Sequence, residues 1–128
     1  MSKNQLEAGT TVSVINKTGR YVAELVEWRQ DKALVKILAV LRHPTQGDLH
    51  YPGQVDVVFH QRRALACNEK TWVHPASVKP YEEEIPDYKE SLQKAIDTEM
   101  AKLREKGDQW SEKSIAMLED LKHDYFKN

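Results

Sequence analysis

The fold is decided by residues 10–41, which read TTVSVINKTGRYVAELVEWRQDKALVKILAVL. Polar and apolar residues alternate over residues 10–15, the period-two pattern of a half-buried strand. Two further apolar runs follow at residues 21–28 and 33–41, each preceded by a short polar stretch. Gly19 predicts a tight turn before the second run, because glycine tolerates a positive φ angle. We therefore expect three consecutive strands joined by short turns.

The chain then contains a long loop at residues 42–53, where two prolines and two glycines exclude regular secondary structure. A loop of this length in a small domain is usually either functional or disordered. Strand-like alternation returns at residues 55–59, and residues 63–67 and 71–73 can supply one or two more short strands. This spacing of short strands and turns predicts a five-stranded small β-barrel over residues 1–80.

Residues 81–128 have a helical pattern, so the predicted fold class is α+β. An acidic connector leads to Asp87, which can cap a helix, and Glu90 would complete the capping box. Gly107 is expected to end that helix. Ser111 is expected to cap a second helix, and the short loop between them predicts an antiparallel helical hairpin.

The net charge of −1 hides a difference between the two regions. Residues 1–79 hold 11 Lys and Arg against 7 Asp and Glu, whereas residues 80–128 hold 8 against 13. The regions therefore present different surfaces. The small basic excess of the first region does not by itself indicate nucleic-acid binding.

Several classes of protein are excluded by simple patterns. The longest apolar stretch, at residues 33–41, is far shorter than the roughly 18 residues that a membrane span needs. No apolar segment follows the first residues, so we expect no signal peptide, no membrane insertion and a cytoplasmic location. Cys67 is the one cysteine of the chain, which excludes an intramolecular disulfide and a cysteine-built zinc site.

The sequence offers little support for a metal site or for catalysis. His43, Asp48 and His50 share the long loop, but their spacing matches no tight metal-binding motif. The nucleophile-elbow, phosphate-loop and dinucleotide motifs are absent from the sequence. Cys67 lies in a predicted strand, where a thiol is usually a small core residue. We therefore predict no enzyme activity, no metal and no cofactor.

A nucleic-acid-binding barrel is the alternative interpretation. Three arginines flank the long loop and the strand after it: Arg42, Arg62 and Arg63. Small barrels bind nucleic acids when aromatic side chains such as Tyr51 interleave with such charges. On this interpretation the chain would be a nucleic-acid-binding protein of the kind associated with ribosomes. The opposing interpretation, which we favour, places Phe59 and Trp72 in the core and treats the arginines as ordinary rim charges.

The apolar stripes of the two predicted helices are expected to meet in a seam that contains Leu92, Ile96, Leu103, Leu118 and Leu121. A stripe wider than the seam must cover the barrel or a second subunit, because large exposed apolar patches are rare in monomers. Three further residues are the candidates for contact with the barrel or, in a homodimer through the hairpin, with a second subunit: Met100, Met117 and Tyr125.

Four segments resemble the kinase-associated protein B family of spore-forming Bacillus relatives. They read KTGRY at residues 17–21, VKILAVLRHPTQGDLH at 35–50, RRALA at 62–66 and YEEEIPDY at 81–88. The resemblance spans nearly the whole chain and implies an SH3-like barrel followed by a helical hairpin. Members are sometimes labelled lipoproteins, but Cys67 lies in mid-chain with no signal peptide before it.

The family resemblance implies a regulatory adaptor. It suggests a partner of a membrane sensor histidine kinase that feeds the phosphorelay starting sporulation, so that the chain would be cytoplasmic and peripheral to the inner membrane through that kinase. A protein without a catalytic group can activate a kinase only by binding one of its conformations more tightly. We hypothesise that the long loop and two nearby arginines form the contact surface: Arg42, His43, Gln46, Asp48, His50, Arg62 and Arg63.

Overall fold

A computed structural model describes residues 6–47 and 61–127 of the chain. Its sheet contains β1 (Thr11–Asn16), β2 (Gly19–Arg29), β3 (Lys32–Arg42), β4 (Lys70–Val73) and β5 (Lys79–Pro80), with a 3-10 helix at Pro75–Ser77. Two helices follow, α1 (Tyr88–Lys106) and α2 (Gln109–Phe126). The predicted α+β class is confirmed, and the predictions of the first three strands are confirmed to within a few residues.

The five strands form one antiparallel sheet in the order β4-β3-β2-β1-β5. Pairing among the described residues leaves β4 and β5 as the two edges, so closure into a barrel stays a prediction. Residues 61–66 form no strand, which corrects the strand expected at 63–67. The strand predicted at 55–59 lies outside the described residues.

The β1–β2 hairpin is tight because of two local features. The positive φ of the turn lies at Lys17, at 56°, and not at Gly19 as the sequence predicted. Gly19 is required for a different reason, since a Cβ there would lie 2.5 Å from the hydroxyl oxygen of Tyr21. Tyr21 fills the core beside the turn and is 1% exposed. The ring of Tyr21 therefore approaches the backbone too closely for any other residue.

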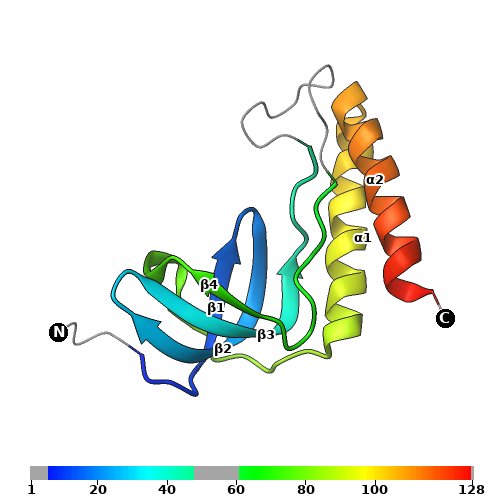
Figure 1. Cartoon of the computed structure of the whole chain (residues 1–128). Helices are drawn as coiled ribbons and strands as arrows, with labels where there is room; N and C mark the ends of the chain where they lie inside the picture. The colour runs from blue at the N-terminus through cyan, green and yellow to red at the C-terminus, as the bar shows by residue number, and fades with distance from the viewer. Residues whose placement is uncertain (1–5, 48–60, 128) are drawn as a thin grey trace.

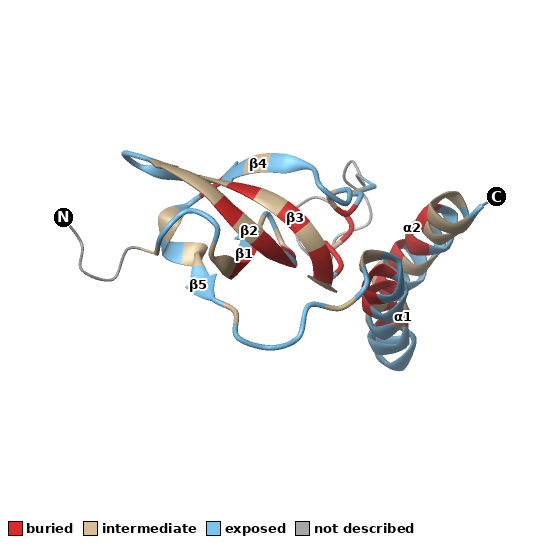
Figure 2. Ribbon diagram, turned by 90° about the horizontal axis from the view of Figure 1, so that it is seen from below, coloured by how far each residue is buried: buried red, intermediate tan, exposed pale blue. Residues whose placement is uncertain are grey.

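The helical hairpin stands beside the end of the sheet, as Figures 1 and 2 both show. Leu92 and Ala95 of α1 belong to the apolar cluster of the sheet. The seam between the helices forms a second cluster of Ile96, Met100, Leu103, Leu118 and Leu121. The seam prediction is therefore confirmed except at Leu92, which contacts the sheet. The wide stripe is covered by the chain's own sheet, and a homodimer stays a prediction.

The helix ends are fixed by side-chain caps. Asp87 accepts the backbone N–H of Glu90, and Gly107 ends α1 with a φ of 65°, as predicted. The cap of α2 is Asp108, which accepts the N–H of Ser111 at 2.7 Å. The prediction that Ser111 is the cap is wrong. The Asp108 carboxylate is the capping group, and α2 begins at Gln109, two residues before Ser111.

Candidate functional site

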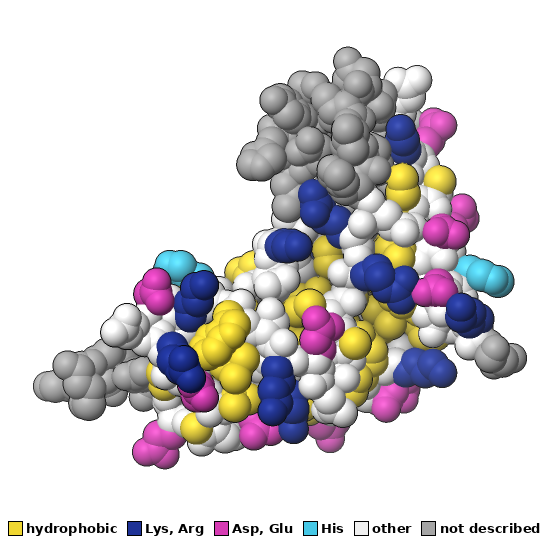
Figure 3. All heavy atoms as spheres, in the orientation of Figure 1, with side chains coloured by type: hydrophobic (Ala, Val, Ile, Leu, Met, Phe, Trp, Pro, Cys, Tyr) yellow, Lys and Arg dark blue, Asp and Glu magenta, His cyan; other side chains and the backbone are white. Residues whose placement is uncertain are grey.

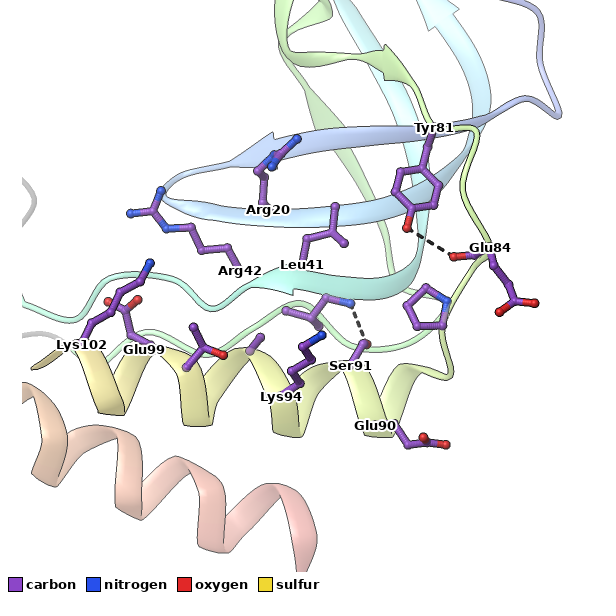
Figure 4. A pocket seen from close by; sticks show the side chains of 14 residues that line it. Arg20, Leu41, Arg42, Tyr81, Glu84, Glu90, Ser91, Lys94, Glu99 and Lys102 are labelled. Carbon is purple, nitrogen blue, oxygen red and sulfur yellow. Dashed lines mark hydrogen bonds between the residues drawn. The ribbon is translucent and has the colours of Figure 1, made fainter. Parts of the chain in front are cut away.

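A groove of about 850 Å³ lies between the sheet and α1. The end of β3 forms one wall with Val40, Leu41 and Arg42, and one face of α1 forms the other. The connector between β5 and α1 closes the groove at one end (Figure 4). The groove therefore lies where the two halves of the chain meet.

Hydrogen bonds hold the two walls together. The backbone N–H of Val40 donates to the Ser91 hydroxyl at 2.9 Å, and that hydroxyl donates to the Tyr88 carbonyl at 2.7 Å. In the connector, the Tyr81 hydroxyl donates to the Glu84 carbonyl at 3.3 Å (Figure 4). The bond between Val40 and Ser91 joins β3 directly to α1, which fixes their separation at this point of the groove.

Four cations line this groove. Arg20 and Arg42 are direct cross-strand partners in β2 and β3, while Lys94 and Lys102 come from α1. All four are exposed, and none forms an ion pair with a carboxylate of residues 6–47 or 61–127. Three carboxylates also line the groove, those of Glu84, Glu90 and Glu99.

Residues 61–66 run beside the helices without regular secondary structure, held by three tyrosine hydroxyls. Tyr21 accepts the N–H of Leu65 at 3.2 Å, and Tyr88 donates to the carbonyl of the same residue at 2.5 Å. Tyr125 accepts the N–H of Ala64 at 2.9 Å. Burial raises the pKa of Tyr21 to about 12 and raises those of the other two, so the hydroxyls stay protonated.

His43 and Gln46, which we expected on a contact surface, are buried. His43 is fully buried, and its Nδ1 lies 3.0 Å from the Pro44 carbonyl, so Nδ1 carries the proton. Its Nε2 then accepts the Tyr125 hydroxyl proton at 2.9 Å. Burial lowers the pKa of His43 to about 4, and the Pro44 bond opposes this effect. Both nitrogens are engaged, so His43 offers no lone pair to a metal.

Gln46 joins the start of the long loop to the segment 61–66. Its amide nitrogen donates to the Arg62 carbonyl at 3.0 Å, and its amide oxygen accepts the Arg62 N–H at 2.9 Å. The expectation that Gln46 and His43 contact a partner directly is therefore corrected for this structure. Both side chains are turned inward by hydrogen bonds to backbone and tyrosine groups, and they position the segment.

The three predicted contact arginines differ in their exposure and in the bonds that they form within the chain. Arg42 is exposed in the groove, whereas Arg62 is half-buried and donates its Nε to the Gly47 carbonyl at 3.2 Å. Arg63 forms an ion pair with Asp124 at 2.7 Å, and its guanidinium lies 5.1 Å from the centre of the Tyr125 ring. The arginines are therefore not one shared patch.

Several predicted residues lie outside the described residues: Asp48, His50, Tyr51 and Phe59. Within the described part of the chain, no group of three or more His, Cys, Asp or Glu could hold a metal ion. The helices in that part are also too short or too polar to cross a membrane.

Two expectations about buried residues are wrong. Cys67 is exposed in a turn, because the segment before it bonds to tyrosines in place of a neighbouring strand. Trp72 is 40% exposed, because its position in β4 points to the outer face of the sheet, where the Arg29 guanidinium lies 5.6 Å from its ring. Figure 3 shows hydrophobic side chains next to Lys and Arg side chains on the sheet surface.

Sequence reasoning found Arg42 but missed the other cations of the groove. Two signals were available. Regular pairing of the second and third strands through their short turn would place Arg20 opposite Leu41, next to Arg42, and irregularities in the β2–β3 register then give the direct Arg20–Arg42 pairing. Lys94 and Lys102 are eight residues apart in the predicted helix, which puts both on one face.

The comparisons with known proteins agree on one family. A family model described as kinase associated protein B matches residues 16–126. This chain belongs to the kinase-associated protein B family. A relative named kinase-associated lipoprotein B, from Bacillus subtilis (strain 168), is 47% identical over 94% of this chain and 94% of its own length.

A solved member of the kinase-associated protein B family also shares the fold. The crystal structure of kinase-associated protein B from Bacillus cereus is 40% identical, with a TM-score of 0.82. The match covers 94% of this chain and 98% of that one. The names of these relatives associate them with a kinase.

Proposed function

We propose that this chain is a non-enzymatic adaptor that binds a sensor histidine kinase and supports signalling in the phosphorelay that starts sporulation. The observation that carries the proposal is membership of a family named for association with a kinase. The proposal places the chain in the cytoplasm, at the inner membrane where the kinase holds it.

An adaptor of this kind acts through differential affinity. A ligand shifts the balance between two kinase conformations only to the extent that it binds one more tightly. A tenfold shift requires about 1.4 kcal/mol, which a few well-placed contacts provide. The exposed cations and the groove between sheet and helices offer such contacts without any reacting group.

The contact surface is proposed to include Arg42, Asp48, His50 and Arg63, with Arg62 at its margin. His43 and Gln46 are left out of this surface, because both are buried and bonded to backbone carbonyls. Binding of nucleic acid is not proposed, since the family to which the chain belongs is named for association with a kinase.

The test uses the purified full-length sensor kinase in lipid nanodiscs and this full chain. We expect the chain to be retained by the kinase and to change its autophosphorylation rate in a saturable way. The variant Asp48→Ala/His50→Ala should weaken retention, whereas the matched change Glu82→Ala/Glu83→Ala in the exposed connector should not. The proposal would be contradicted if the kinase did not retain the wild-type chain and if its autophosphorylation rate did not change when the chain was added.

A further inference from the structure

The pairing of β2 with β3 places two arginines opposite each other at the edge of the groove. Arg20 and Arg42 are direct cross-strand partners, an arrangement that destabilises a sheet when the charges are alike. Neither pairs with a carboxylate of the described residues. The charges of this pair are therefore available to an anionic partner that enters the groove.

The opposite wall adds two more cations. Lys94 and Lys102 are eight residues apart on α1, so they project from the same face of the helix. The two walls also carry apolar groups, those of Val40 and Leu41 on β3 and of Ala95 on α1. The groove can therefore contact both the charged and the apolar side chains of a bound segment.

The charges of the groove are separated along its length. Figure 4 shows Arg42 and Lys102 at one end, with Glu99 beside Lys102. Glu84 and Glu90 lie at the other end, near the connector (Figure 4). A field of this shape favours a segment that is acidic at one end, and it sets the direction in which that segment lies.

We propose that this groove binds an extended acidic segment of the partner kinase, with its carboxylates against Arg20, Arg42 and Lys102. The identity of the partner rests on the function proposed above, whereas the chemistry of the segment rests on the groove alone. A nucleic acid fits less well, because its phosphates continue along its whole length and would meet Glu84 and Glu90 at the connector end of the groove (Figure 4). A small anion would leave most of the 850 Å³ unfilled.

The test removes the paired arginines and compares them with another pair. Lys36 and Lys70 are also direct cross-strand partners in this sheet, but they lie outside the groove. The variants Arg20→Gln/Arg42→Gln and Lys36→Gln/Lys70→Gln therefore change charge equally at two places. The probes are the fluorescein-labelled peptides EEELLK and KKKLLE, and binding to the full chain is measured by fluorescence anisotropy.

We expect the wild-type chain to bind EEELLK, more weakly at higher salt, and to bind KKKLLE at least about tenfold less tightly. The groove variant should bind EEELLK at least about tenfold less tightly than the control variant does. In urea unfolding it should be no less stable than the wild type, because a repulsive pair has been removed. Retention by the kinase should fall in parallel.

The outcomes separate this inference from the proposed function. Wild-type binding of EEELLK weaker than about 1 mM, or equal binding by both variants, would overturn the acidic-segment assignment even if the kinase retains the chain. Loss of peptide binding by the groove variant without loss of kinase retention would overturn the kinase as the source of the segment. Failure of the kinase to retain the wild type would contradict the proposed function. The peptide result would then decide whether the groove binds acidic segments.

Discussion

The His43 side chain joins the end of β3 to the last turn of α2. Its Nδ1–H donates to the Pro44 carbonyl, and its Nε2 accepts from Tyr125, whose oxygen also accepts the Ala64 N–H. A second proton on the ring would put a donor where Tyr125 now donates. The neutral ring is therefore the form that the folded chain stabilises, in agreement with its low pKa.

This bond network predicts a stability that depends on pH. Burial lowers the pKa of His43 from 6.5 to about 4, so below pH 6.5 the unfolded chain binds a proton that the folded chain does not. The contribution should be fully present above pH 6.5 and fall by about 3 kcal/mol as the pH decreases through 4. Urea unfolding across this range measures the free energy.

The control for this prediction is His43→Phe, which keeps a ring but has no titratable nitrogen. The variant should be less stable at neutral pH, because Tyr125 loses its acceptor. The difference in unfolding free energy between wild type and variant should shrink as the pH falls. A difference that stays constant from pH 6.5 to 4 would show that His43 does not titrate as described.

At the scale of elements, the helical hairpin depends on a two-residue connection. Gly107 has a φ of 65° and its N–H donates to the Leu103 carbonyl at 3.0 Å. Asp108 follows at once in an extended conformation and caps α2. The chain therefore reverses direction at a single left-handed residue, which sets how the two helices meet.

Gly107→Ala should destabilise the chain by about 1 kcal/mol, because residues with a Cβ avoid the left-handed region. The cost is one of backbone conformation, since a Cβ there would meet its nearest atom, the Arg104 carbonyl oxygen, at an ordinary 3.7 Å. Gly107→Asn should cost less, because asparagine tolerates this conformation. Thermal unfolding followed by circular dichroism gives both losses of stability. Equal losses in the two variants would show that the left-handed backbone conformation is not the cause.

The elements that local periodicity specifies were predictable from the sequence. Strands β1 to β3 and helix α1 with both of its caps follow from residues that are neighbours in sequence. The run 63–67 has the same composition as a strand, yet it is a coil held by Tyr21, Tyr88 and Tyr125. Those partners lie between 23 and 61 residues away, so no local pattern contains them.

The candidate site was predictable only in part for the same reason. Arg42 stood beside a conspicuous loop and was found. The burial of His43 depends on Tyr125, 82 residues later, and that of Gln46 on a backbone 16 residues later. Polar residues in a loop rich in proline and glycine suggest exposure, and only the tertiary bonds turn these two inward.

At the scale of the whole molecule, the sheet and the hairpin share one core. Leu92 and Ala95 of α1 pack in the cluster of the sheet, and Tyr125 of α2 packs against both clusters. The groove between the sheet and α1 keeps its shape only while this packing holds. We therefore expect the chain to unfold as one cooperative unit, as small single domains do.

Leu121→Ala tests this coupling, because Leu121 is 1% exposed in the helical seam and does not belong to the sheet cluster. The substitution should cost about 3 kcal/mol. Hydrogen exchange measured by NMR should then show the amides of Val22 and Leu25 in β2 losing as much protection as those of α2. Ile15→Ala, at a side chain 47% exposed, should change neither set much. Loss of protection confined to the helices would mean that the hairpin unfolds without the sheet. The sheet and the hairpin would then not form one cooperative unit.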